Sequence, residues 1–302
     1  MKNIIRSTTF LAILASWLWS TAFVGVKIGL DYQSPLQFAG IRFFISGLLL
    51  FLFFGNPRRF FSEFMKSPWF ILLIALFQIF IQYAFFYTGL TLVPSALAAM
   101  VVGSSPLFVA VFVHFALKND RMTKAKLVSI VVGVIGIAII TLGRATVEIK
   151  GEYEWVGILL LIFNNISSGF SNVLVLKRST GVSPVVLSSA SLMAGGAALF
   201  LVSLPLEGLN MGPFPAEYYL SLGWLSFLSA AAFSIWFALI KRPGVKISEL
   251  NVWKFLIPVS GAILSWLIIT DEHPDVTSIV GMVVIGLSLV ILNLFGRDAA
   301  KK

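Results

Sequence analysis

Neutral polar side chains recur at helical spacing within otherwise apolar stretches of this sequence. Asn164, Ser168 and Asn172 are each four residues apart, and Gln78 and Gln82 are likewise one helical turn apart. Residues four apart share one face of a helix. Because a side-chain amide facing lipid loses its hydrogen bonds, these faces are expected to turn toward protein or water. They predict either the walls of a cavity for a small molecule or polar contacts that hold helices together.

Aromatic residues accompany these polar faces. Ser20 and Phe23 share a face beside Trp19, and Tyr83 follows Gln82. We predict that Trp19, Ser20, Phe23 and Tyr83 join the five polar residues in lining the cavity, where the rings would accept an apolar group; packing between helices is the alternative. Aromatic residues near the ends of apolar stretches are typical of membrane interfaces, and four are assigned there: Tyr87, Trp236, Trp253 and Trp266.

Three basic residues fall within apolar stretches or near their ends. Arg42 is included in the predicted cavity because a guanidinium suits a substrate carboxylate, although it could also extend outward to the interface. Lys254 is predicted to reach the nearer membrane interface. His114 is predicted to be an interfacial residue, with a proton relay as the alternative. No predicted helix interior contains Asp or Glu, which disfavours coupling through a buried carboxylate. Facilitated diffusion, exchange or coupling through another group stay open.

The composition argues against metal sites, catalytic sites and nucleotide-binding loops. The sequence has no cysteine and only two histidines, so no thiolate or histidine metal site and no cofactor are predicted. We find no pairing of a nucleophile with a base, no zinc-protease spacing and no phosphate-binding glycine loop. The net charge of +9 could indicate nucleic acid, but the basic residues lie in short connections between apolar runs. Membrane topology explains this pattern better, and no nucleic-acid partner is predicted.

The elements that must position these residues are membrane helices. Hydrophobic residues make up 58% of the 302 residues and charged residues 12%, about half the charged share of soluble domains. A spanning helix needs about 20 apolar residues, and irregular backbone is excluded from lipid. We therefore predict an all-α membrane protein with ten transmembrane helices at residues 8–28, 35–54, 69–91, 94–117, 124–143, 155–176, 184–205, 217–240, 250–270 and 276–295.

Charge then predicts the orientation. When the ten spans cross the membrane in chain order, most of the 22 Lys and Arg residues fall on the face that holds both termini. The opposite face receives only Lys27, Arg144 and Lys150. Because basic residues are retained on the cytoplasmic side, both termini are predicted to be cytoplasmic, in a multi-pass protein of the inner (plasma) membrane.

The second half of the sequence partly repeats the first. Pro106 lies twelve residues before the segment 118–120, and Pro258 lies twelve residues before the segment 270–272. Ser-Pro also opens both the second and the seventh predicted span. We predict two repeats, residues 1–146 and 147–302, each of five helices. Five is odd, so the two repeats would be inverted. Paired prolines bend corresponding helices, which predicts hinges at Pro106 and Pro258 near the binding region.

Several of these segments resemble the EamA-type members of the drug/metabolite transporter superfamily, along essentially the whole chain. The matching segments are Trp19–Phe23, Arg42–Phe43, Ser95–Ala99, Pro106–Leu107, Pro258, Asp271–Glu272, Val280–Gly281 and Gly286. The resemblance implies an inner-membrane carrier of small metabolites, amino acids among them, often exported. It also implies a central cavity lined by the first, third, fourth, sixth, eighth and ninth spans. One departure is that Asn119-Asp120 stands where the family often has Gly-Glu.

Together these features predict a secondary transporter that moves a small metabolite across a lipid bilayer by alternating access. A structural or sensory membrane subunit, or an intramembrane enzyme, are the alternatives. A structural or sensory subunit would leave the two matched repeats unexplained. An intramembrane enzyme would need a catalytic group, and the sequence shows none. The sequence leaves open the identity of the substrate, the direction of transport, the coupling ion and whether the protein forms a homodimer.

Overall fold

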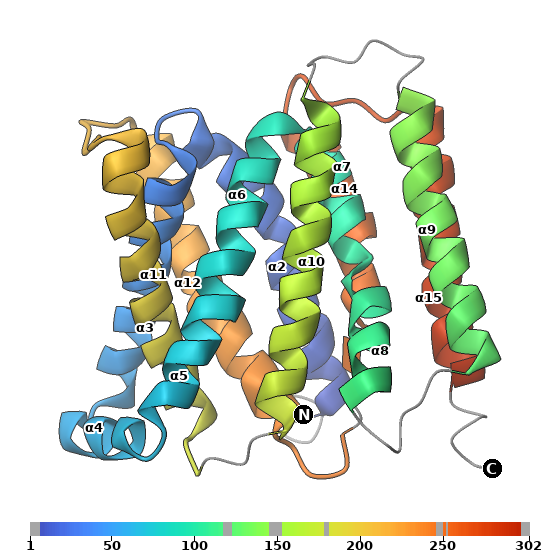
Figure 1. The fold of residues 1–302 in the computed structure, drawn as a ribbon. Helices are drawn as coiled ribbons and strands as arrows, with labels where there is room; N and C mark the ends of the chain where they lie inside the picture. Colours follow the sequence, from blue (N-terminus) through green and yellow to red (C-terminus); the bar gives the residue numbers. More distant parts are fainter. Residues whose placement is uncertain are drawn as a thin grey trace.

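The computed structural model describes residues 7–116, 123–144, 153–177, 181–245, 250–251 and 253–296, and every regular element in these ranges is a helix. Most helices run side by side along one direction (Figure 1). Their bounds are α2 Thr8–Leu30, α3 Pro35–Phe54, α4 Pro57–Met65, α5 Pro68–Ile74, η1 Ala75–Ile81, α6 Gln82–Leu92, α7 Ser95–Gly103, α8 Ser105–Ala116, α9 Lys124–Arg144, α10 Glu154–Lys177, α11 Pro184–Glu207, α12 Ala216–Ile240, η2 Trp253–Phe255, α14 Leu256–Ile268 and α15 Val276–Gly296.

Many of these helices have the length and composition of membrane spans. Within the described ranges, seven helical segments are long and apolar enough to cross a bilayer. Three shorter apolar helices cover 127–139, 256–268 and 276–291. The prediction of an all-helical, multi-pass membrane protein is confirmed, whereas the count of ten spans stays a prediction. The predicted boundary between repeats, at residues 146 and 147, lies outside the described residues.

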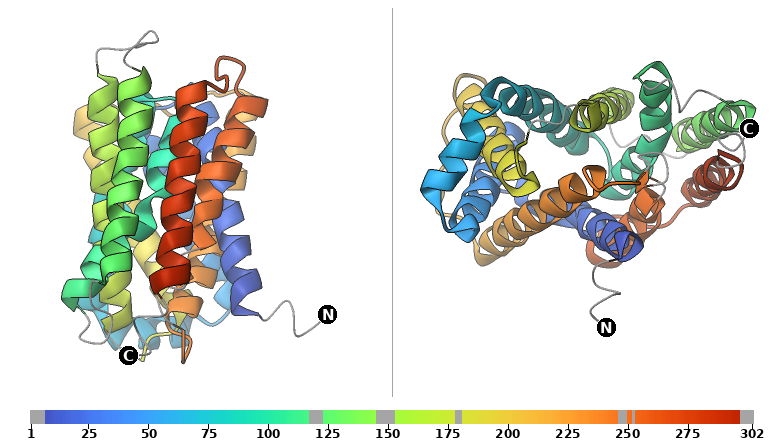
Figure 2. Two further views of the ribbon diagram at one scale, coloured as in Figure 1. Left: turned by 90° about the vertical axis from the view of Figure 1, so that its right-hand side faces the viewer. Right: turned by 90° about the horizontal axis from the view of Figure 1, so that it is seen from below.

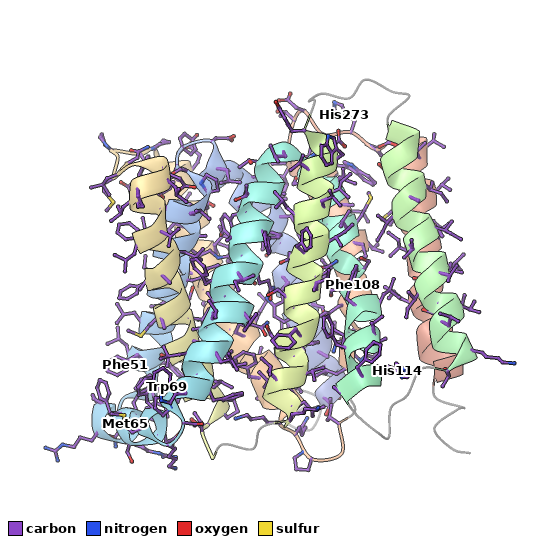
Figure 3. All side chains as sticks on the ribbon, in the orientation of Figure 1. Phe51, Met65, Trp69, Phe108, His114 and His273 are labelled. Carbon is purple, nitrogen blue, oxygen red and sulfur yellow. The ribbon has the colours of Figure 1, made fainter. Side chains whose placement is uncertain are left out.

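The outer surface is apolar, as a lipid environment requires. Large hydrophobic side chains are exposed along α3, α9, α11, α12 and α15. The short helix α4 lies across one end of the molecule, where Met65 and the nearby Trp69 point outward (Figure 3). His114 lies at this same end, at the foot of α8 (Figure 3). Aromatic and amphipathic residues at one level are typical of a membrane interface, so α4 indicates where the hydrocarbon ends.

Helices α3 and α11 are in backbone contact. A Cβ added to Gly40 would lie 2.5 Å from the backbone nitrogen of Phe200, and one added to Gly196 would lie 2.5 Å from that of Phe44. No side chain fits at either position, so glycine is what allows the two helices to approach this closely. A second close pair, α9 and α15, stands at one side of the molecule (Figures 1 and 2).

Two helices in the centre are irregular. The segment α5–η1–α6 is continuous, but its middle, Ala75–Ile81, is a π-helix, a form found mostly as short interruptions at functional sites. Between α7 and α8 the helix is broken at Ser104, whose φ and ψ are −76° and −1°. Ser104 comes two residues before Pro106, which has no N–H to donate to the carbonyl of Val102 four residues earlier and whose ring crowds that carbonyl. Both irregularities face the cavity described next.

Candidate functional site: a central cavity

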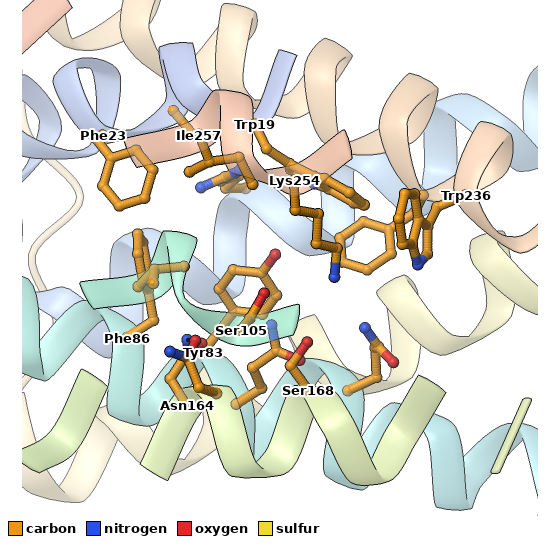
Figure 4. Close-up of a pocket in the computed structure, with 17 residues that line it drawn as sticks. Trp19, Phe23, Tyr83, Phe86, Ser105, Asn164, Ser168, Trp236, Lys254 and Ile257 are labelled. Atoms are coloured by element: carbon orange, nitrogen blue, oxygen red, sulfur yellow. Dashed lines mark hydrogen bonds between the residues drawn. The ribbon is translucent and has the colours of Figure 1, made fainter. Parts of the chain in front are cut away.

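A cavity lies between α2, α3, η1, α6, α7, α8, α10, α12, η2 and α14 (Figure 4). The volume open to a water-sized molecule is about 70 Å³, so the space is narrow compared with the roughly 300–1,000 Å³ of pockets that hold drug-sized ligands. Trp19, which lines it, is halfway along α2, so the cavity lies at mid-depth in the helix bundle. Eight of the ten residues predicted to line a cavity do so: Trp19, Phe23, Arg42, Gln78, Gln82, Tyr83, Asn164 and Ser168.

The two remaining predicted residues do not line this cavity. Ser20 is buried and its hydroxyl donates to the carbonyl of Trp17 at 2.7 Å, within its own helix. Asn172 is also buried, and its side-chain oxygen accepts a hydrogen bond from the indole nitrogen of Trp236 at 3.0 Å. Asn172 therefore orients a ring that lines the cavity, but does not itself reach the space.

One wall of the cavity is aromatic. Trp19 meets Trp236 edge to face, with ring centroids 5.1 Å apart, and Phe233 at 5.9 Å. Phe23 also lies on this side and meets Phe86, of α6 on the other side of the cavity, with ring centroids 5.6 Å apart (Figure 4). The assignment of Trp236 to the membrane interface is wrong, because its side chain is 1% exposed and lines the cavity. Trp236 is four residues from the end of α12, and sequence position alone does not distinguish an inward face from an interfacial one.

The opposite wall carries amides. The side-chain oxygens of Gln78 and Gln82 are buried and accept no hydrogen bond from the described part of the chain. Asn164 donates to the side-chain oxygen of Asn165 at 3.1 Å. Buried acceptors without donors are rare in proteins. Gln78 and Gln82 therefore offer two acceptors to a molecule in the cavity.

Asn165, which the sequence analysis did not include, stabilises the break between α7 and α8. Its side-chain nitrogen donates to the carbonyl of Val101 at 2.8 Å and to the hydroxyl of Ser104 at 3.3 Å. A break leaves backbone carbonyls without helical donors, and an inserted amide satisfies them. In the same way, the hydroxyl of Ser167 donates to the carbonyl of Phe77 in the π-helix at 2.6 Å. Helix α10 thus supports both irregular helices.

Arg42 lines the cavity but is held by neutral groups. Its guanidinium donates to the hydroxyl of Tyr87 at 2.6 Å, to the hydroxyl of Ser229 at 2.8 Å and to the carbonyl of Leu225 at 3.3 Å. The alternative of an outward-extending Arg42 is excluded, since its side chain is 1% exposed. Tyr87, predicted to be interfacial, is completely buried as the partner of Arg42.

Lys254 is the largest departure from the sequence analysis. Its side chain is 5% exposed and lines the cavity instead of reaching the interface. The Nζ atom lies 4.6 Å from the ring centroid of Trp236 and 5.4 Å from that of Trp19. Each such contact stabilises a desolvated ammonium by roughly 2 kcal/mol. This offsets only part of the penalty of several kcal/mol for burying an ion.

The two predicted hinge residues lie beside the cavity. Pro106 follows Ser105, and Pro258 follows Ile257, and both preceding residues line the space. The two helix segments also touch, because a Cβ added to Gly103 would lie 2.2 Å from the Pro258 ring. The role of the prolines as hinges stays a prediction.

The cavity offers hydrogen-bond acceptors, aromatic faces and two basic side chains. In the part of the chain that the structure describes, no group of three or more His, Cys, Asp or Glu residues could hold a metal ion.

Comparisons with known proteins agree that the relatives of this chain are named as transporters. Residues 6–142 and 155–294 match the EamA-like transporter family. Similar proteins include the uncharacterized transporter YvbV of Bacillus subtilis, 26% identical over 97% of this chain and 94% of that protein. A probable amino-acid metabolite efflux pump of Salmonella typhimurium is 26% identical, with 96% of both chains covered. An S-adenosylmethionine/S-adenosylhomocysteine transporter of Chlamydia muridarum is 24% identical over 93% of this chain and 90% of its own. One crystal structure has the same fold, with a TM-score of 0.73 at 21% identity and 97% and 98% of the two chains covered.

Proposed function

Because the chain belongs to the EamA-like transporter family, we propose that it is a secondary transporter that binds a small metabolite in the central cavity and exposes it alternately to the two faces of the membrane. The observation that carries this proposal is the cavity itself. It lies at mid-depth among membrane helices, and opposite aromatic rings its walls hold the side-chain oxygens of Gln78 and Gln82, which accept no hydrogen bond from any described residue. Such polar groups are expensive in a membrane interior and mark substrate paths.

The proposal includes ten spans in two inverted repeats, residues 1–146 and 147–302. Reciprocal helix caps support this symmetry. The carboxylate of Glu207, at the end of α11, accepts hydrogen bonds from the backbone N–H groups of Leu36 and Gln37 at the start of α3, at 2.9 and 3.0 Å. Conversely, Glu63 follows α3 and accepts one from the N–H of Ser183 at the start of α11, at 3.1 Å. Each helix of the pair is therefore capped from beyond the end of the other.

Motion in this proposal centres on the bends. The α3–α11 contact is too close for sliding, whereas the breaks at Ser104 and before Pro258 interrupt helical hydrogen bonds beside the cavity. We infer that α7–α8 and α14 bend there to open one face at a time. Charge distribution supports cytoplasmic termini in the inner membrane.

The relatives suggest the substrate class. One is named as an amino-acid metabolite efflux pump and another as a transporter of S-adenosylmethionine and S-adenosylhomocysteine. We propose an amino acid or related compound, carried outward. A hydrogen-bonding wall opposite an aromatic wall suits a molecule with a polar end and an apolar remainder.

Uptake into proteoliposomes containing the purified protein tests the proposal, across labelled amino acids and related metabolites, with and without a pH gradient. Saturable uptake without a gradient is expected for a facilitator, and accumulation only with a gradient for a coupled carrier. Asn164→Leu and Trp19→Ala should each lower the rate. Trp17→Ala is the matched control, because Trp17 is 48% exposed and lies on α2, the same helix as Trp19. Unchanged uptake in both cavity variants would remove the cavity from the mechanism.

The hinge part is tested separately with Pro106→Ala and Pro258→Ala combined. Restoring backbone donors at both bends should straighten the helices and slow transport while leaving substrate binding in place. A double variant that transports at the normal rate would exclude bending at these prolines.

A further inference from the structure

The cavity contains positive charge that nothing in the described chain neutralises. Lys254 and Arg42 both line it, and both are almost completely buried. In the described ranges no carboxylate lies within ion-pair distance of either cation, since the only ion pair found there joins Arg59 to Glu63. The acidic residues of the described helices lie at helix ends, away from the depth of the cavity.

The two cations differ in what already holds them. Arg42 is fixed by Tyr87, Ser229 and a backbone carbonyl, so its main effect on the cavity is its charge. Lys254 makes no hydrogen bond to a described residue. Its Nζ lies over the faces of Trp19 and Trp236. The ammonium therefore keeps its three donors for another partner.

The placement of Lys254 directs those donors into the space. Its side chain extends from the side of the cavity that carries Trp19 and Ile257 toward the side that carries Tyr83 and Ser168 (Figure 4). A molecule between the two walls would meet the ammonium at one end and the free amide oxygens of Gln78 and Gln82 at another. An ammonium with no counter-charge in a low dielectric favours an anion strongly.

We propose that the substrate is a small organic anion whose carboxylate is bound by Lys254, with its apolar part against the aromatic wall and a hydrogen-bond donor at the glutamines. This inference rests on the proposed function, because it names the substrate class of the same cavity. It sets an order among related molecules: at equal size, a net anion binds better than a zwitterion, and a zwitterion better than a cation.

Three labelled probes share one phenyl ring and an α-substituent that can donate a hydrogen bond, and they differ in charge: 3-phenyllactate, phenylalanine and phenylalaninamide. Binding to the purified protein in detergent is measured for each at millimolar concentration. The wild type should bind the anion at least about tenfold more tightly than the cation. Lys254→Met, which keeps the length of the side chain, should abolish that preference. Lys254→Arg should keep it, and Lys66→Gln, which removes an exposed lysine, is the matched control.

The outcomes separate this inference from the proposed function. Lys254→Met should bind phenylalaninamide at least as well as the wild type does, which also shows that the variant is folded. Equal binding of anion and cation by the wild type, or binding of none of the three, overturns the anion inference. A preference that survives in Lys254→Met overturns the role of Lys254. Binding of the anion without its transport in proteoliposomes keeps the anion site and contradicts the transporter proposal.

Discussion

Glu272 caps the helix that begins at Ser95. One carboxylate oxygen of Glu272 accepts hydrogen bonds from the backbone N–H and the hydroxyl of Ser95, at 2.6 and 2.7 Å, and the other accepts from the N–H of Ala96 at 2.8 Å. Glu272 is 7% exposed. A negative charge at a helix N-terminus satisfies donors that the helix cannot pair internally. The contact joins the segment after α14 to the start of α7, the two elements that meet again at Gly103 and Pro258.

Replacing Glu272 by Gln should destabilise the protein by about 1–2 kcal/mol, because one acceptor oxygen and the negative charge are lost. Glu272→Ala, which removes both acceptors, should lower stability by about 3 kcal/mol. Chemical unfolding in detergent measures both. Asp31→Asn is the control, since Asp31 is exposed at the same end of the molecule. Wild-type stability in Glu272→Ala would show that the cap is dispensable.

The contact between Gly103 and Pro258 leaves no room for a methyl group. Gly103→Ala would place a Cβ 2.2 Å from the proline ring, so α7 and α14 must separate. We expect a loss of about 1–3 kcal/mol and slower uptake in proteoliposomes. Gly223→Ala is the matched control within a helix, because nothing lies within 4 Å of its added Cβ. The control should leave stability unchanged or raise it by up to about 1 kcal/mol. Equal free energies of unfolding for Gly103→Ala and Gly223→Ala would contradict the packing argument.

Arg42 is not replaceable by lysine. A single ammonium cannot reach Tyr87, Ser229 and the Leu225 carbonyl together, so Arg42→Lys should cost about 2–3 kcal/mol of stability. Tyr87→Phe removes one of these contacts and should cost about 1–1.5 kcal/mol. If the two residues act through their shared hydrogen bond, the double variant will lose less than the sum of the two single losses. Strict additivity would mean that this hydrogen bond contributes nothing.

Glu63 caps the start of α11, and its contribution to the stability of the protein should depend on pH. The hydroxyl of Ser183 is the main cause that holds the pKa of Glu63 below its ordinary value of 4.5, with the Ser183 N–H and the nearby Arg59 adding to it. A carboxyl with a depressed folded-state pKa stabilises the protein fully above the unfolded-state pKa, and this contribution is lost as pH falls through the lower folded-state pKa.

Unfolding of the wild type and of Glu63→Gln should therefore be compared from neutral pH downward. The wild type should be the more stable of the two at neutral pH, and the difference should shrink once pH falls below about 4.5. A difference that is constant with pH would show that the charge of Glu63 does not act on α11.

The sequence predicted the helices well because hydrocarbon imposes a simple rule on length and composition. Residues 35–54, for example, are α3 without any change of boundary. The cavity was partly predictable for the same reason, since amides such as Gln82 and Asn164 must turn away from lipid. Ser20 illustrates the limit, because a serine can satisfy its hydroxyl within its own helix.

Lys254 shows what sequence position alone misses. Lys254 lies near the end of an apolar stretch, a position that favours an extension to the membrane interface. The direction of a side chain depends on which helix face meets neighbours, and here α2 and α12 provide two indole rings toward the centre. The π-helix in Ala75–Ile81 has a similar origin, because its support comes from Ser167 of another helix.

The pairing of α3 with α11 has a consequence for biosynthesis. The carboxylate that caps α3 belongs to Glu207, and the glycine face of α3 fits only α11. Both partners are translated about 150 residues after α3, a delay of roughly 8 to 30 s at ordinary elongation rates. During that interval α3 must reside in the bilayer with an open N-terminus and an unmatched glycine face. The helix α3 therefore gains its N-terminal cap and its packing partner only after the second half of the chain has been translated.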